Sequence, residues 1–331
     1  MKTRDCYRCN LKALLLFLVI VGHAIEWDIG ASLSAEVLYR CIYLFHMPLF
    51  VFLSGMGIKG GLRSLKSAGR TFLIYAAAQG VVALWTAFRG GTLTVSWVTT
   101  PYWHLWYLLS LAYWYIIAGA VASVTSRLRT KAAGRVKRVV FLASIAAGAL
   151  WGFIPYAGRP WSLSRTVAFL PFLLAGAFWG ESILNRLKRA YRLLPMLLAG
   201  CVLLFFLLWK LPVSCLYHAA PYRYTQMPGA AGALGRLGCY AAAACFSAVV
   251  LILCPKKKLP VTAVGADTLW LYLLHPLVVL PLRRMPHPPE AAVPMGIGAA
   301  AVLMAVTAGL LKLRGQRYRF VTEEGALLSK R

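Results

Sequence analysis

Three histidines and one lysine stand inside long apolar stretches of the sequence, where polar side chains are costly and mark functional sites. Lys12 and His23 lie eleven residues apart in the first stretch, His46 lies in the second, and His275 lies in a late one. A neutral imidazole is a natural acceptor for the proton of an alcohol, so His23 is the candidate general base. For His46 and His275 we weigh stabilisation of an oxyanion against a purely structural hydrogen bond.

The spacing of these residues predicts their depth in a membrane. At ~1.5 Å of rise per residue, Lys12 and His23 lie about 16 Å apart along a helix, which puts Lys12 at the inner face and His23 near mid-membrane. His46 and His275 are expected at comparable depth. The histidines show no i, i+4 pairing and no accompanying carboxylate cluster, so we expect no metal site.

Membrane helices must position these side chains. The 331 residues are 60% hydrophobic and 14% charged, with a mean hydropathy of +0.68. About 20 helical residues cross a ~30 Å hydrocarbon core, and the apolar runs are too long for barrel strands. We predict an all-α polytopic membrane protein in one domain, 1–331, whose last span ends near 312 before a basic tail, 313–331. The ten predicted spans are 11–29, 35–57, 70–88, 104–124, 138–156, 165–183, 192–210, 232–254, 262–283 and 291–312.

The net charge of +27 follows the predicted topology. Lysine and arginine gather in alternate loops, which predicts a cytoplasmic N-terminus and C-terminus in an inner membrane. Contact with anionic membrane lipid explains this charge better than binding to nucleic acid. The basic segments are 2–12, 59–70, 127–138, 186–192, 256–258 and the tail from 312.

Four short strings of sequence contain the polar residues of the spans. The strings are LKALLLFLVIVGHA with Lys12 and His23, FHMPLFVFLSG from Phe45 to Gly55, HLWYL from His104 to Leu108, and LYLLHP from Leu271 to Pro276. In order and spacing they resemble the motifs of the acyltransferase-3 family of integral-membrane O-acyltransferases. The segment Leu163 to Gly176 looks like the branch related to fucose 4-O-acetylases.

This resemblance implies transfer of an acyl group, usually acetyl from acetyl-CoA, to hydroxyls of sugars and cell-envelope polymers. It implies that His23 acts as the base, either in direct transfer or through an acyl-histidine. Lys12, Lys66 and Arg70 are then expected to hold the phosphates of acetyl-CoA. The family often has Arg-x-x-Arg after the second span, whereas this chain has Ser67 three positions before Arg70.

Four further residues are candidates for binding the acceptor. His104 belongs to the HLWYL string, and Trp106 could stack on a sugar or belong to an interfacial aromatic belt. Arg165 and Arg236 could contact an anionic acceptor or extend to the membrane interface. A transporter or a sensory membrane module is the competing interpretation. The acceptor, the acyl chain length and the oligomeric state are left open by the sequence.

Overall fold

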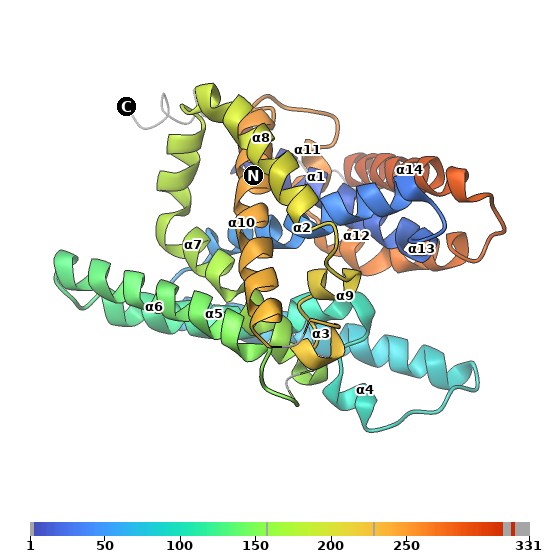
Figure 1. Ribbon diagram of the computed structural model, residues 1–331, viewed down its shortest axis with the longest axis horizontal. Helices are drawn as coiled ribbons and strands as arrows, with labels where there is room; N and C mark the ends of the chain where they lie inside the picture. The colour runs from blue at the N-terminus through green and yellow to red at the C-terminus, as the bar shows by residue number, and fades with distance from the viewer. Residues whose placement is uncertain (1–2, 157, 228, 314–318, 322–331) are drawn as a thin grey trace. The chain divides into compact units, whose positions relative to one another are not determined.

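The computed structural model describes residues 3–156, 158–227, 229–313 and 319–321, and its elements can be followed along the chain in Figure 1. Most of the predicted tail, 313–331, lies outside the described residues. The helices are α1 (Cys6–Ile25), α2 (Leu33–Gly55), α3 (Leu62–Phe88), α4 (Ser96–Thr99), α5 (Trp106–Thr125), α6 (Thr130–Trp151), α7 (Leu163–Leu187), α8 (Leu194–Leu207), α9 (Val213–Leu216), α10 (Ala230–Leu253), α11 (Thr262–Ala266), α12 (Leu269–Leu274), α13 (Pro276–Leu282) and α14 (Ala292–Leu313).

Helices dominate the fold, which confirms the predicted all-α polytopic architecture. Among the described residues, seven helices are long and apolar enough to cross a membrane, and two shorter apolar helical segments, 191–207 and 269–282, accompany them. The predicted ninth span is broken into α11, α12 and α13. The count of ten spans stays a prediction. The short strands β1 (Thr3–Asp5) and β2 (Arg319–Val321) pair in parallel.

The described chain forms two compact units. The first unit contains residues 1–50, 187–201 and 243–331, and the second contains residues 51–186 and 202–242. The division runs through α2, α8 and α10 and separates the last residue of α7, so each of these helices contributes residues to both units.

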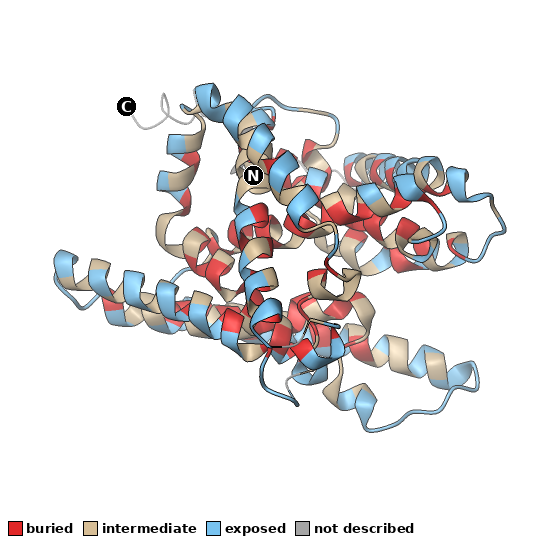
Figure 2. Ribbon diagram, in the orientation of Figure 1, coloured by how far each residue is buried: buried red, intermediate tan, exposed pale blue. Residues whose placement is uncertain are grey.

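In the first unit α1 is the central helix and contacts α11, α13 and α14. In its most apolar stretch of 18 residues, 67% of the residues are buried. Figure 2 shows the buried positions. Asn10 ties α1 to the chain before α11, because its amide donates to the Pro255 and Lys257 carbonyls, each at 2.8 Å. At Gly265 the backbone of α11 touches α1, where an added Cβ would lie 1.7 Å from the Cys9 carbonyl oxygen. These contacts fix the helix that carries His23.

The second unit is held together by hydroxyl groups as well as by apolar packing. The Ser110 hydroxyl on α5 lies 2.9 Å from that of Ser162 and 2.8 Å from that of Thr166, at the start of α7. The Trp114 indole donates to the Thr166 carbonyl at 2.9 Å. These bonds satisfy polar groups that lipid could not satisfy.

Helix α3 of the second unit shows the opposite burial pattern to α1. It contacts α5, but only 11% of the residues in its most apolar 18-residue stretch are buried. Leu73, Leu84 and Trp85 are exposed. Exposed apolar side chains along a membrane helix contact lipid tails, which are as apolar as they are. This side of α3 therefore fits a lipid-facing surface.

Candidate active site

The first unit brings His23 and His275 into direct contact. His23 lies on the last turn of α1, and His275 lies between α12 and α13. The Nδ1 atom of His23 is 2.9 Å from the Nε2 atom of His275, and the two rings stack with centroids 5.2 Å apart. His275 is fully buried, whereas His23 is partly exposed. The pair therefore offers its accessible member, His23, to a reactant.

Pro276 explains how His275 is held. In a helix the N–H of residue 276 would donate to the carbonyl of residue 272, but proline has no N–H. The Tyr272 carbonyl is thereby left without its helical donor. The Nδ1 atom of His275 lies 2.7 Å from that oxygen. The dipeptide His275-Pro276 thus creates the acceptor that orients its own histidine.

These contacts assign the protons of the neutral pair. A carbonyl oxygen only accepts hydrogen bonds, so Nδ1 of His275 carries the proton and donates to Tyr272. Nε2 of His275 then has a lone pair and accepts from Nδ1–H of His23. The lone pair of neutral His23 therefore lies on Nε2, and this atom is the one able to take up a proton.

Charged side chains stand on the same two segments as the pair, at different distances along them. Eleven residues are close to three helical turns, so Lys12 and His23 share one face of α1. Glu26, three residues beyond His23, forms an ion pair with the buried Arg283 that follows α13. The Arg283 guanidinium also lies over the Trp27 ring, 5.0 Å from its centroid. This ion pair joins the end of α1 to the end of α13.

His46 lies on α2 in the same unit and is buried. Its Nδ1 atom is 2.7 Å from the Ile42 carbonyl oxygen of its own helix, and so Nδ1 is the donor. A neutral ring in this tautomer has no second N–H for an oxyanion, and the same holds for His275. An oxyanion role would therefore require either ring to carry a second proton, and it stays a prediction.

The predicted donor-site residues belong to both units. Lys12 is part of the first unit, whereas Lys66 and Arg70 lie four residues apart on α3 of the second, which places them on one exposed face. A hollow of about 510 Å³, partly open to solvent, lies between α5, α6 and α7. Lys137, Thr125 and Ser126 line it. Lys137 belongs to the basic segment 127–138, and the two hydroxyl residues directly precede this segment. An ammonium group and two hydroxyl groups are suitable partners for a phosphate.

The predicted acceptor residues all lie in the second unit. The Arg165 guanidinium lies over the Trp106 ring, 4.8 Å from its centroid. Trp106 stacks on Phe169 at 5.6 Å, and His104, two residues earlier in the chain, is buried. Phe169 in turn makes an edge contact with His218 at 5.2 Å. The structure thus gathers aromatic and cationic side chains from three distant parts of the sequence.

Two features of these sites were missed by the sequence reasoning. His218 was not singled out, although it stands in a loop rich in tyrosine. The role of Pro276 was also missed, although the string LYLLHP shows the proline directly after the histidine. The signal was available there, because a proline in an apolar helix always frees the carbonyl four residues before it.

The apolar helices define the class of the protein: a multi-pass membrane protein, in which two histidines from distant parts of the chain are in contact. No group of three or more His, Cys, Asp or Glu side chains in the described part of the chain could hold a metal ion. Residues 10–312 match the family model of the acyltransferase-3 domain. The chain therefore belongs to the acyltransferase-3 family and is a membrane acyltransferase. Comparison with curated proteins and with solved structures gave no match.

Proposed function

We propose that the protein moves an acetyl group from cytoplasmic acetyl-CoA to a hydroxyl of a sugar, polysaccharide or other cell-envelope acceptor. The observation that carries this proposal is the His23–His275 pair, in which Tyr272 and Pro276 orient a base on α1. The resemblance to O-acyltransferases supports the choice of a hydroxyl acceptor and of acetyl-CoA as the donor.

Proton transfer by His23 is the central step of the proposed reaction. The acceptor hydroxyl gives its proton to Nε2 of His23 as its oxygen attacks the thioester carbonyl. The C–O bond forms, the C–S bond breaks, and the leaving thiolate takes the proton back from Nε2. Throughout, Nδ1–H of His23 keeps its bond to His275, which stabilises the imidazolium and holds the ring in place.

The donor and the acceptor approach from opposite sides in this proposal. Acetyl-CoA is cytoplasmic, and the alternation of basic loops puts both termini in the cytoplasm and the protein in the inner membrane. Lys12, Lys66 and Arg70 bind the donor phosphates, and His104, Trp106 and Arg165 contact the acceptor. A C-terminal reporter that is active only in the cytoplasm should give signal, and one that is active only outside it should be silent. The reverse pattern would contradict the topology.

The decisive experiment measures transfer of radiolabelled acetyl from acetyl-CoA by the purified protein. A positioned general base contributes about 10²–10⁴-fold, so His23→Gln should lose transfer by this factor while it still inserts and binds acetyl-CoA. His287→Gln is the matched control, since this histidine lies in a loop outside the pair; because it contacts Asp28, Tm is measured for both variants, and the control should keep its transfer rate per folded protein. Mass spectrometry of surface glycans should show a mass shift of one acetyl group when the protein is present.

Two results would contradict the proposal. If His23→Gln retains more than about a tenth of the transfer rate, the loss is too small for a general base. If the wild-type protein consumes no acetyl-CoA with any cell-envelope acceptor, the proposed acetyl transfer is wrong. The transporter interpretation would then be favoured.

A further inference from the structure

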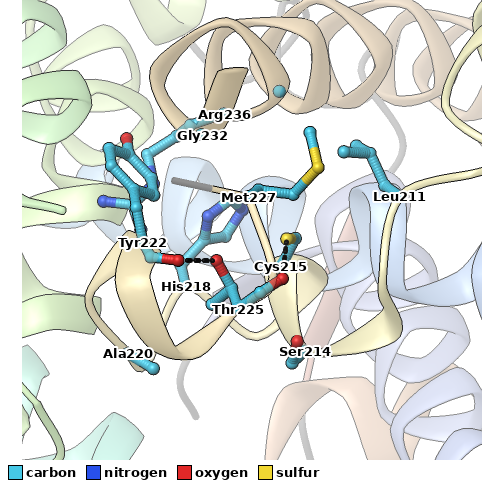
Figure 3. Close-up of a pocket in the computed structure, with 11 residues that line it drawn as sticks. Leu211, Ser214, Cys215, His218, Ala220, Tyr222, Thr225, Met227, Gly232 and Arg236 are labelled. Carbon is cyan, nitrogen blue, oxygen red and sulfur yellow. Dashed lines mark hydrogen bonds between the residues drawn. The ribbon is translucent and has the colours of Figure 1, made fainter. Parts of the chain in front are cut away.

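A pocket in the second unit lies where the segment between α8 and α10 folds over the first turns of α10 (Figure 3). Its empty volume is about 280 Å³, part of it open to solvent, and its enclosed interior has room for about one water-sized group. Three polar side chains that matter for its chemistry are His218, Tyr222 and Arg236.

His218 is the most unusual residue of this pocket. Its side chain is 5% exposed, and within the described residues its buried Nδ1 atom has no hydrogen-bond partner. Its backbone is left-handed, with φ at +51°, a conformation that is uncommon for residues other than glycine. Figure 3 shows the imidazole in the middle of the lining side chains. Strain and an unsatisfied buried nitrogen at one residue are a mark of a binding site.

Arg236 supplies positive charge to the same pocket. It is 5% exposed, and its guanidinium lies over the Tyr222 ring, 4.8 Å from the centroid. One N–H donates to the Gly148 carbonyl at 2.8 Å, the single hydrogen bond that the described residues give it. A guanidinium has five N–H donors. Most of the N–H donors of Arg236 are therefore left for a ligand.

The second unit contains little negative charge to balance Arg236. Residues 51–186 and 202–242 include one acidic residue, Glu181, and it is exposed on α7. Burial, followed by the positive charges of Arg236 and Arg165, lowers the pKa of His218 well below its usual 6.5. A buried cation without a compensating anion is strongly unfavourable, so an anionic ligand would relieve this environment.

We propose that this pocket binds one oxygen of an anionic group, a carboxylate or a phosphate, on the sugar acceptor. The oxygen accepts from an N–H of Arg236 and from Nδ1–H of His218, which satisfies both groups at once. The narrow interior admits an oxygen atom rather than a sugar ring, so the ring stays outside the pocket. This inference rests on the proposed function, because it identifies the acceptor as an acidic saccharide.

The test is calorimetric binding of glucuronate, glucose and inorganic phosphate to the purified full-length protein. We expect glucuronate and phosphate to bind and glucose not to bind. Arg236→Met should weaken glucuronate binding roughly 10- to 100-fold, the range expected when a hydrogen bond to a charged group is lost. Arg223→Met is the matched control, because this exposed arginine in the same segment does not line the pocket.

A second variant guards against misfolding of Arg236→Met. His218→Asn keeps a residue that tolerates the left-handed backbone and removes the ring, and it should weaken binding in the same direction. Equal weakening in Arg223→Met, or no binding of glucuronate and phosphate to the wild type, would overturn the proposal. So would competition by phosphatidylglycerol alone, which would indicate a lipid site. If binding fails while acetyl transfer to neutral acceptors persists, this inference falls and the proposed function stands.

Discussion

Replacement of Pro276 by alanine should lower acetyl transfer without destabilising the protein. The alanine restores a backbone N–H at position 276, which competes with His275 for the Tyr272 carbonyl. His275 then loses part of its orientation and its preferred tautomer. His23, whose Nδ1 lies 2.9 Å from His275, is positioned less well in turn.

The size of the effect follows from the single hydrogen bond that is weakened. A net intramolecular hydrogen bond contributes about 0.5–1.5 kcal/mol, and about 1.4 kcal/mol corresponds to tenfold in rate. We therefore expect kcat to fall about two- to tenfold, far less than for His23→Gln. Stability should change little, because Pro276 is the first residue of α13, a position where proline is tolerated.

The assay combines the rate of radiolabelled acetyl transfer with thermal unfolding in detergent. Pro281→Ala is the matched control, because Pro281 lies inside α13 and frees the Leu277 carbonyl, which forms no hydrogen bond with a histidine in the described part of the chain. Lower activity at a nearly unchanged Tm in Pro276→Ala alone would support the reasoning. Unchanged activity in that variant, or an equal loss in Pro281→Ala, would refute it.

Three other predictions concern the donor, the packing and the pH response. Arg70→Ala should raise the KM for acetyl-CoA, more so at low salt because such contacts are screened; an unchanged KM would remove Arg70 from the donor site. Gly265→Ala should lower Tm, because its Cβ would lie 1.7 Å from a backbone oxygen, whereas Gly298→Ala, in open space, should not. A backbone hydrogen bond and then Asp28 raise the pKa of His287 above 6.5. This stabilisation is present below 6.5 and lost as pH rises through the raised pKa, so Asp28→Asn should lower Tm more at about pH 5.5 than at about pH 8.5.

The sequence by itself determined the class of the fold and its general chemistry. Apolar runs of about 20 residues dictate helices in lipid, because every backbone polar group must be satisfied within its own segment. The order and spacing of the four strings from Lys12 to Pro276 were sufficient to predict the family that residues 10–312 match. These features are local, so they can be seen in a one-dimensional sequence.

The tertiary structure alone decided which of these residues meet. His23 and His275 are 252 residues apart in the chain, and their contact depends on the packing of α1 against α13 and α14. His46 is also a histidine with a similar predicted depth, yet its Nδ1 atom bonds to the Ile42 carbonyl of its own helix. The pocket at His218 likewise depends on a left-handed residue and on a distant arginine. Such pairings arise from long-range packing, which local residue patterns do not specify.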